Sequence, residues 1–286
     1  LDILETYWED KTIMLDSQKS PLDMRVAFID TLIDCARENP SIWLLIGDVG
    51  FGLVEPFQAE FPDRFINVGV AEQNMIGVAT GLALSGKVVF CYTFASFAVT
   101  RCLEQVRNDV CYHNANVKIV GGGGGLIFGS LGMSHHATED ITIMRALPNM
   151  TVIAPCDATQ TKLATKAIVE SGNPCYLTLS KAGDSITYNK MPEFKIGEAI
   201  KFRDGKDVAL MATGGIASEV LAAAELLAKD GIECRVLGFH TVKPIDYVEI
   251  GYSILNTKLI VTVEEHNLDG GFGSAVAEEI MDMGFS

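Results

Sequence analysis

Positively charged residues are scarce in this sequence of 286 residues. Lys and Arg number 22 against 37 Asp and Glu, so the formal net charge at pH 7 is −15. A chain this acidic is repelled by nucleic acid and by anionic membrane surfaces, so we expect neither as a partner. Small anionic ligands remain possible, because backbone N–H groups and a few cations can bind them locally.

Long apolar runs are also missing. The longest ones, such as VVFCY and LIVTV, are far too short to cross a bilayer. The first residues, LDILETYWEDK, are acidic where a secretory signal needs a basic segment before an apolar one. The seven cysteines are odd in number and form no CxxC pair, so they predict reduced core residues rather than disulfides or a zinc site. These features predict a cytoplasmic protein.

Short apolar runs alternate with amphipathic ones through the first two thirds of the chain. Strands that are apolar throughout and alternate with helices indicate an α/β fold with a parallel sheet covered on both faces. The predicted strands are Ile42–Ile46, Phe65–Val68, Lys87–Tyr92, Val117–Val120, Thr151–Ala154 and Cys175–Leu179. The predicted helices are 21–38, 54–61, 72–84, 97–113, 139–146 and 157–171.

The alternation lapses between about Ser180 and Lys206, where Gly, Lys, Asp and Pro are frequent, and then resumes. We therefore predict a first domain over 1–185, a linker over 186–206 with a short strand or two, and a smaller α/β domain over 207–286. The second domain ends inside a helical pattern, so we expect a further strand and helix to follow. Its predicted elements are strands Val208–Ala212, Glu233–Gly238 and Lys258–Val263, and helices Ala217–Lys229 and Phe272–Met283.

The segment Phe65–Gly86 places a carboxylate at the carboxyl end of a predicted strand. Glu72 opens the helix that follows the Gly69 turn, and open α/β sheets bind ligands at this edge. Glu72 could instead only complement the positive end of its helix. The polar pair Gln73-Asn74 beside it, where an amphipathic helix would carry apolar side chains, favours a site.

Two phenylalanines lie near the end of the next predicted strand. Phe94 and Phe97 are three residues apart, so they share a helical face if the turn has begun. Such pairs either belong to the core or form an apolar slot for a flat heterocycle.

A glycine-rich loop follows the strand Val117–Val120. Its five consecutive glycines allow a close approach of the backbone to a ligand, but the lysine of a phosphate-binding loop is missing. His135 and His136 follow, and adjacent side chains project in different directions. A single histidine acting on a proton is therefore favoured over a shared metal ion, with capping of the next helix as the alternative.

Two further polar clusters lie at predicted strand ends. One is Gly47-Asp48, and the other is Glu264-Glu265-His266-Asn267 before two glycines. The second cluster could be a solvated loop or a subunit contact as well as a site.

Taken together and in this order, several segments resemble the transketolase family of thiamine-diphosphate enzymes, in particular the C-terminal subunit of split transketolases. They are GVAEQNMIGVATGLAL, TFASF…EQVRNDV, the glycine-rich loop ending in GMSHH, PNMTVIAPCD, and TVKPID…TVEEHNLDGGFGSAVAE. The resemblance covers roughly residues 21–286. It implies a parallel-sheet pyrimidine-binding domain followed by a smaller α/β transketolase C-terminal domain.

The resemblance assigns cofactor roles to five residues. Glu72 stands where the family has the glutamate that hydrogen-bonds the aminopyrimidine ring of thiamine diphosphate. Phe94 and Phe97 stand in the aromatic pocket, with Phe97 favoured for stacking, and Met75 adds to its lining. Asp48 matches an acidic position near the cofactor. A carboxyl beside the ring nitrogen favours the imino tautomer, which requires an apolar setting where Glu72 can share a proton.

Substrate roles follow from the same resemblance. His135 aligns with the family's active-site histidine and His136 replaces a usual glutamine, so both would handle hydroxyl and carbonyl protons. Lys181 falls where many relatives have an arginine that grips the sugar phosphate, and it keeps the charge without the bidentate geometry. Arg25 matches a second cationic position.

One motif of the family is missing from this sequence, and its absence implies a partner subunit. Relatives hold the diphosphate through Mg²⁺ on a Gly-Asp-Gly motif with an Asn further along the chain, and Gly47-Asp48-Val49-Gly50 has no such continuation. The resemblance therefore implies no metal ligand in this chain. It implies an N-terminal transketolase subunit that binds the diphosphate and ligates the Mg²⁺, in a heterotetramer with two copies of each subunit.

The implied reaction is transfer of a two-carbon ketol unit from a ketose phosphate to an aldose. One alternative is decarboxylation of a 2-oxo acid, as in deoxyxylulose-phosphate synthase or the β-subunits of oxo-acid dehydrogenases. Another is an assembly subunit without catalysis. The Phe97 pocket and the histidine pair favour ketol transfer, and retention of Glu72 with both phenylalanines argues against a non-catalytic role.

Overall fold

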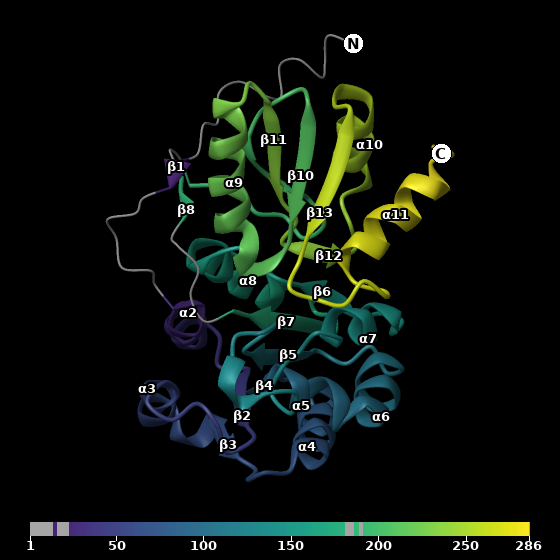
Figure 1. The fold of residues 1–286 in the computed structure, drawn as a ribbon. Helices are drawn as coiled ribbons and strands as arrows, with labels where there is room; N and C mark the ends of the chain where they lie inside the picture. The colour runs from purple at the N-terminus through teal and green to yellow at the C-terminus, as the bar shows by residue number, and fades with distance from the viewer. Residues whose placement is uncertain (1–13, 16–22, 181–185, 189–190, 286) are drawn as a thin grey trace.

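The computed structural model describes residues 14–15, 23–180, 186–188 and 191–285. Within these ranges the chain forms two α/β units, the first at the bottom of Figure 1 and the second above it. A short antiparallel pair, β1 (Met14–Leu15) with β8 (Ile186–Thr187), lies apart from the two main sheets.

The first unit is built on a seven-stranded sheet with the order β12-β6-β7-β5-β4-β2-β3. Its strands are β2 (Ile42–Ile46), β3 (Phe65–Asn67), β4 (Val88–Phe94), β5 (Val117–Gly122), β6 (Thr151–Ile153), β7 (Cys175–Leu179) and β12 (Thr241–Lys243). The first six run parallel, and β12 is antiparallel to β6. The predicted parallel α/β sheet is confirmed, because apolar strands such as β2 can be buried on both faces.

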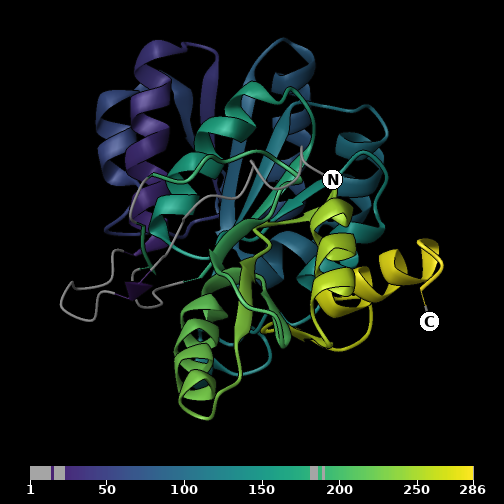
Figure 2. The same cartoon turned by 90° about the horizontal axis from the view of Figure 1, so that it is seen from above.

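Helices cover both faces of this sheet. Leu44 packs in the core cluster of one face and Leu45 in that of the other, as the alternation of side chains along a strand requires. One face carries α2 (Met24–Glu38), α3 (Glu55–Glu60) and α8 (Ala158–Glu170), with α2 and α8 packed side by side (Figure 2). The other carries α4 (Glu72–Leu84), α5 (Ala95–Thr100), α6 (Leu103–Gln105) and α7 (Asp140–Ala146).

The single helix predicted over 97–113 was wrong. The segment is divided into α5, α6 and a π-helix over Val106–Cys111, and the backbone leaves helical geometry at Cys102, where φ is −122° and ψ is 24°. No Gly or Pro stands at this break, so the helical spacing of apolar residues gave no signal of it. The break ends α5 at the edge of the sheet, and π-helical turns occur often near functional sites.

The second unit contains a four-stranded sheet with the order β13-β10-β11-β9. Its strands are β9 (Ile200–Arg203), β10 (Val208–Ala212), β11 (Cys234–Gly238) and β13 (Leu259–Val263). Its helices are α9 (Ala217–Lys229), α10 (Tyr247–Asn256) and α11 (Phe272–Asp282). Strand β9 lies inside the predicted linker 186–206, so this sheet begins before residue 207.

The two units share a strand and a core. The chain leaves β11 and returns to the first unit as β12, which extends the seven-stranded sheet beyond β6. Met211 and Phe239 belong to the same core cluster as Met144 of α7 and Val152 of β6. The second unit is therefore fixed against the first by backbone pairing and by apolar packing.

The described part of the chain contains no helix that is long and apolar enough to cross a membrane. All seven cysteines are free, six of them buried and Cys35 half-buried.

Candidate active site

Several loops meet at the carboxyl edge of the seven-stranded sheet, where parallel sheets bind ligands. Gly47 follows β2 and donates its N–H to the carbonyl of Tyr92 in β4. A Cβ atom at Gly47 would lie 3.2 Å from Thr93 Oγ1 and 3.6 Å from Glu72 Cγ. The missing side chain at residue 47 therefore lets β2, β4 and the start of α4 approach closely around Glu72.

The carboxylate of Glu72 is buried, with 4% of the side chain exposed, in the first turn of α4. Arg101 Nη1 donates to Oε1 at 3.1 Å and to Oε2 at 3.3 Å, and Thr93 Oγ1 lies 3.5 Å from Oε1. Met75, in the same helix, is fully buried in the core beneath it. The Glu72 carboxylate is thus buried, with the Arg101 cation on the side that faces water.

Arg101 is the residue of this site that sequence reasoning missed. No motif singled it out, yet its guanidinium carbon lies 3.4 Å from the centre of the Phe97 ring while its Nη1 contacts Glu72. Arg101 ends α5 at the C-cap, at the break that the apolar spacing did not reveal. From this position its side chain reaches the first turn of α4.

Three phenylalanines and a histidine form an aromatic group next to Glu72. The Phe94 ring packs edge-on against Phe97 at 5.3 Å, Phe128 at 5.0 Å and His135 at 5.2 Å. The Phe97 and His135 rings are also 5.2 Å apart. The structure therefore brings together both phenylalanines and the first histidine that the sequence singled out. It adds Phe128 from the glycine-rich loop, where no periodic pattern could reveal its packing.

The two histidines of the loop point to different partners. His135 Nδ1 lies 2.9 Å from Ser134 Oγ, with the ring inside the aromatic group. His136 Nε2 donates to the Gly129 carbonyl at 3.0 Å and so ties the loop to itself. Across the described ranges, no group of three or more His, Cys, Asp or Glu residues could hold a metal ion.

The remaining predicted site residues lie further out or outside the described ranges. Asp48, exposed and with φ of 57°, accepts a hydrogen bond from Asn67 Nδ2 at 3.0 Å, at the same sheet edge. Arg25 lies in the first turn of α2, on the opposite face of the sheet from α4, and Asp23 binds it through Nη2 at 2.5 Å. The hydrogen bond from Arg25 to Asp23 raises the pKa of Arg25. Lys181 lies outside the described residues.

The acidic and histidine cluster after β13 contacts the first unit of the same chain. Asn267 donates its N–H to the Thr138 carbonyl at 2.9 Å and its Nδ2 to Glu139 at 3.1 Å. His266 Nε2 accepts from the Thr142 N–H at 3.4 Å, and its Nδ1 donates to the Asn267 carbonyl at 2.8 Å. Glu264 accepts hydrogen bonds from the first N–H groups of α11. Three members of the cluster thus join the two units or cap a helix.

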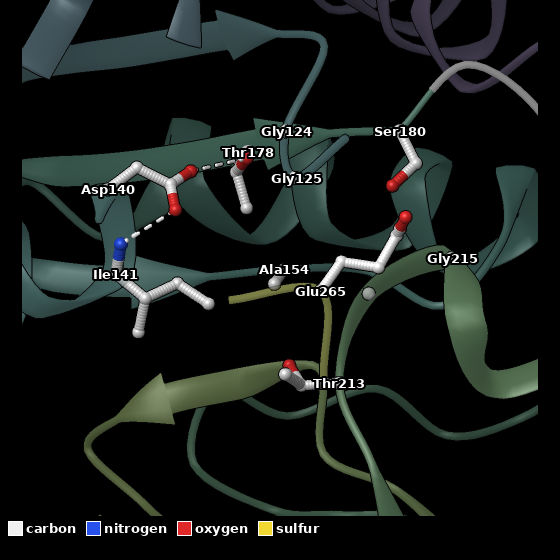
Figure 3. A pocket seen from close by; sticks show the side chains of 11 residues that line it. Gly124, Gly125, Asp140, Ile141, Ala154, Thr178, Ser180, Thr213, Gly215 and Glu265 are labelled. Carbon is white, nitrogen blue, oxygen red and sulfur yellow. Dashed lines mark hydrogen bonds between the residues drawn. The ribbon is translucent and has the colours of Figure 1, made fainter. Parts of the chain in front are cut away.

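A small cavity of about 30 Å³ lies between the two units (Figure 3), with room for about one water molecule. Asp140 at its wall accepts hydrogen bonds from Tyr176 at 2.7 Å and Thr178 at 3.0 Å, and burial raises the pKa of this carboxyl. Burial also raises the pKa of Glu265, whose side chain points towards Ser180 in Figure 3. None of the residues that line this cavity belongs to the aromatic group or contacts the Glu72 carboxylate, so the cavity is separate from the site around Glu72.

Comparisons with known proteins identify both units. Residues 20–183 match the family model of the transketolase pyrimidine-binding domain, and residues 197–286 match that of the transketolase C-terminal domain. A putative transketolase C-terminal section of Methanocaldococcus jannaschii is 42% identical over 92% of this chain and 83% of its own length. One subunit of the apulose-4-phosphate transketolase of Phocaeicola vulgatus is 38% identical over 90% of this chain and 83% of its own length.

A solved structure agrees with these matches. It is described as a split gene transketolase, an inactive β4 tetramer, and it superposes with a TM-score of 0.85 at 39% identity over 92% of this chain and 86% of that chain. Two family models together match most of the sequence, and the relatives match it over most of its length. These matches agree on a single protein family. The chain belongs to the transketolase family of thiamine-diphosphate enzymes and carries the family's pyrimidine-binding domain followed by its C-terminal domain.

Proposed function

We propose that this chain is the C-terminal subunit of a split transketolase and that it catalyses thiamine-diphosphate-dependent ketol transfer together with an N-terminal subunit. The observation that carries the proposal is the buried Glu72 carboxylate beside the aromatic group, at the ligand-binding edge of the sheet. One relative is named as a transketolase C-terminal section and another as one subunit of a transketolase, and both names support a subunit role.

The residues around Glu72 fit the aminopyrimidine half of the cofactor. A flat heterocycle needs an aromatic face and a hydrogen-bonding carboxyl at its edge, and Phe97 and Glu72 provide these side by side. Phe94 and His135 continue the aromatic wall, and Met75 closes the core side. When bound, the cofactor supplies a carbanion at its thiazolium carbon. The proposed role of Glu72 is to share a proton with the aminopyrimidine ring, in a setting that excludes water.

Substrate contacts are proposed for two histidines and two basic residues. His135 has a ring nitrogen tied to Ser134 and a ring packed on Phe94, so it is a positioned group for moving a hydroxyl or carbonyl proton. His136 is proposed for the same task, although it also holds the loop. Asp48 is proposed near the cofactor, and Lys181 with Arg25 as phosphate contacts.

The diphosphate half of the site is proposed to come from an N-terminal subunit that ligates Mg²⁺, in a heterotetramer with two copies of each subunit. Exposed apolar side chains in the loops that frame the site support a protein partner. Phe51 is 75% exposed, Val70 71% and Met133 71%, and apolar side chains of this size on loops are commonly covered by a partner surface. A cytoplasmic location stays a prediction.

The test uses the chain purified together with an N-terminal transketolase subunit from the same organism. Calorimetry with thiamine diphosphate and Mg²⁺ is expected to show little binding to this chain alone and strong, Mg²⁺-dependent binding to the complex. Transfer from a ketose phosphate to an aldose is expected from the complex. Consumption of pyruvate with release of carbon dioxide would favour the 2-oxo-acid alternative, and cofactor binding without either reaction would indicate an assembly subunit.

Glu72→Gln tests the central residue. It preserves the shape but removes the carboxyl that shares a proton, so we expect turnover to fall by about 100-fold or more. Stability should stay within about 1 kcal/mol, since Arg101, 41% exposed, can turn to water. Glu104→Gln, at an exposed position of α6, is the matched control and should leave both unchanged. Near-normal rates for Glu72→Gln in the complex would refute the role given to Glu72.

A further inference from the structure

Arg101 contacts both groups that the proposed pyrimidine site requires. Its Nη1 lies 3.1 and 3.3 Å from the two carboxylate oxygens of Glu72, and its guanidinium carbon lies 3.4 Å from the centre of the Phe97 ring. The Glu72 side chain is 4% exposed and that of Arg101 41%. The arginine thus enters from the surface, and its cationic end reaches a buried carboxylate.

A guanidinium and an aminopyrimidine present similar chemistry to such a pair of residues. Both are flat, both stack on an aromatic face, and both offer N–H donors in the plane. Glu72 lies beside Phe97, so a ring that stacks on Phe97 and hydrogen-bonds to Glu72 must fill the volume where the Arg101 guanidinium lies. One carboxylate edge and one aromatic face cannot serve both groups in the same way.

We propose that Arg101 is an internal occupant of the pyrimidine subsite and that the cofactor must displace its guanidinium from Glu72 and Phe97 in order to bind. This inference rests on the proposed function, because it names a residue that regulates access to that same site. It assigns Arg101 a regulatory role and leaves the proton-sharing role with Glu72.

The surroundings of Glu72 explain why an occupant is needed. The only other polar side chain recorded within hydrogen-bonding distance of this carboxylate in the described ranges is Thr93, at the weak distance of 3.5 Å. A buried carboxylate without a strong partner is costly, and a charge-assisted bond from arginine removes that cost. Arg101 therefore keeps Glu72 partnered until a ligand takes over its hydrogen bonds.

The position of Arg101 allows it to leave. It is the C-cap of α5, directly before the break at Cys102, and much of its side chain already faces water. A long, flexible side chain at a helix end can swing outwards without moving the core. Displacement costs part of the binding free energy of the cofactor, and contacts to the diphosphate on the partner would offset that cost. This is why the isolated chain should bind the cofactor poorly.

The experiment measures cofactor binding to the complex with the N-terminal subunit. Arg101→Met keeps the stem of the side chain and removes the guanidinium, Arg101→Lys keeps the charge without the flat stacking surface, and Arg107→Met is the control. Arg107 is exposed on the neighbouring π-helix, where its Nη1 contacts Asn108. Calorimetry gives the dissociation constant for thiamine diphosphate with Mg²⁺, stopped-flow mixing gives its association rate, and thermal denaturation establishes that each variant is folded.

Arg101→Met should bind the cofactor about ten-fold more tightly than the wild type and associate faster, because a charge-assisted bond no longer has to be broken. Arg101→Lys should lie between the two, and Arg107→Met should match the wild type. Unchanged affinity in both Arg101 variants would overturn the inference while the proposed function stands. Weaker binding would overturn it too, because Arg101 would then hold the bound cofactor. If neither the wild-type complex nor any variant binds thiamine diphosphate, the proposed function fails and the inference fails with it.

Discussion

Replacement of His240 by phenylalanine should make the unfolding free energy of the protein less sensitive to acid. His240 is fully buried between β11 and β12, its ring stacks on Phe194 at 3.9 Å, and its Nδ1 lies 2.9 Å from Thr241 Oγ1. Its Nε2 has no hydrogen-bond partner among the residues that the structure describes. Burial lowers the pKa of His240 from 6.5 to about 3, because a charged imidazolium would lose its hydration there.

The sign and size of the effect follow from this lowered pKa. Between pH 6.5 and about 3 the unfolded chain binds a proton at His240 that the folded chain excludes. The stabilisation that depends on uncharged His240 is therefore fully present above pH 6.5, and it is lost progressively as the pH decreases towards 3. From the difference between the two pKa values, this residue alone should remove about 2 kcal/mol between pH 7.5 and pH 5, or a shift in melting temperature of about 4 °C.

Urea denaturation of the wild type and His240→Phe at pH 7.5 and pH 5 measures this quantity. Buried acids act in the opposite direction, since burial raises the pKa of Asp157 to about 6. The difference between the two proteins is therefore the relevant value. The decrease in unfolding free energy from pH 7.5 to pH 5 should be about 2 kcal/mol smaller in His240→Phe. His113→Phe, at an exposed position, should behave like the wild type. An equal decrease in wild type and His240→Phe would refute the reasoning.

Three further predictions concern the second unit and the proposed site. Arg235→Met should lower the unfolding free energy measured in urea by about 3–5 kcal/mol, because it leaves the Glu249 carboxylate buried and unpaired. The double variant with Glu249→Leu should recover most of this loss, and a small effect of Arg235→Met alone would contradict the prediction. Glu264→Ala should lower the unfolding free energy by about 1–2 kcal/mol in the same assay, because the first N–H groups of α11 lose their hydrogen-bond acceptor. An unchanged denaturation midpoint would exclude this capping role of Glu264. His135→Phe keeps the aromatic packing and should reduce kcat about 100-fold with an unchanged melting temperature; full activity would exclude a proton-transfer role.

Much of the fold was predictable because its signals are local. The apolar strand β2 and its successors alternate with helices, and this pattern alone indicated a parallel sheet covered on both faces. The start of α4 at Glu72 also agreed with the spacing of the residues, whereas β4 runs two residues beyond its predicted end at Tyr92. Two strands were harder to place. Strand β9 joins the second sheet from within a polar segment, and the three-residue β12 crosses back to the first sheet.

The sequence indicated which residue types the candidate site contains, but not all of its contacts. Phe94, Phe97 and His135 were singled out separately, and they do meet. Phe128 gave no signal, because its position depends on the path of a glycine-rich loop. The cluster around His266 could have been a site, a solvated loop or a subunit contact, and it instead joins α7 to the second unit.

By itself the sequence determined the α/β class, the resemblance to transketolases, and the carboxylate and aromatic residues at the edge of the sheet. These follow from periodicity and from residue order, which are properties of short segments. Only the tertiary structure decided that Arg101 lies on Phe97 and binds Glu72. Residues 72 and 101 are separated by α4, β4 and α5, so whether their side chains meet depends on where α5 ends. Helix α5 packs against β4 and β5, and these contacts between distant segments are not encoded in any local pattern.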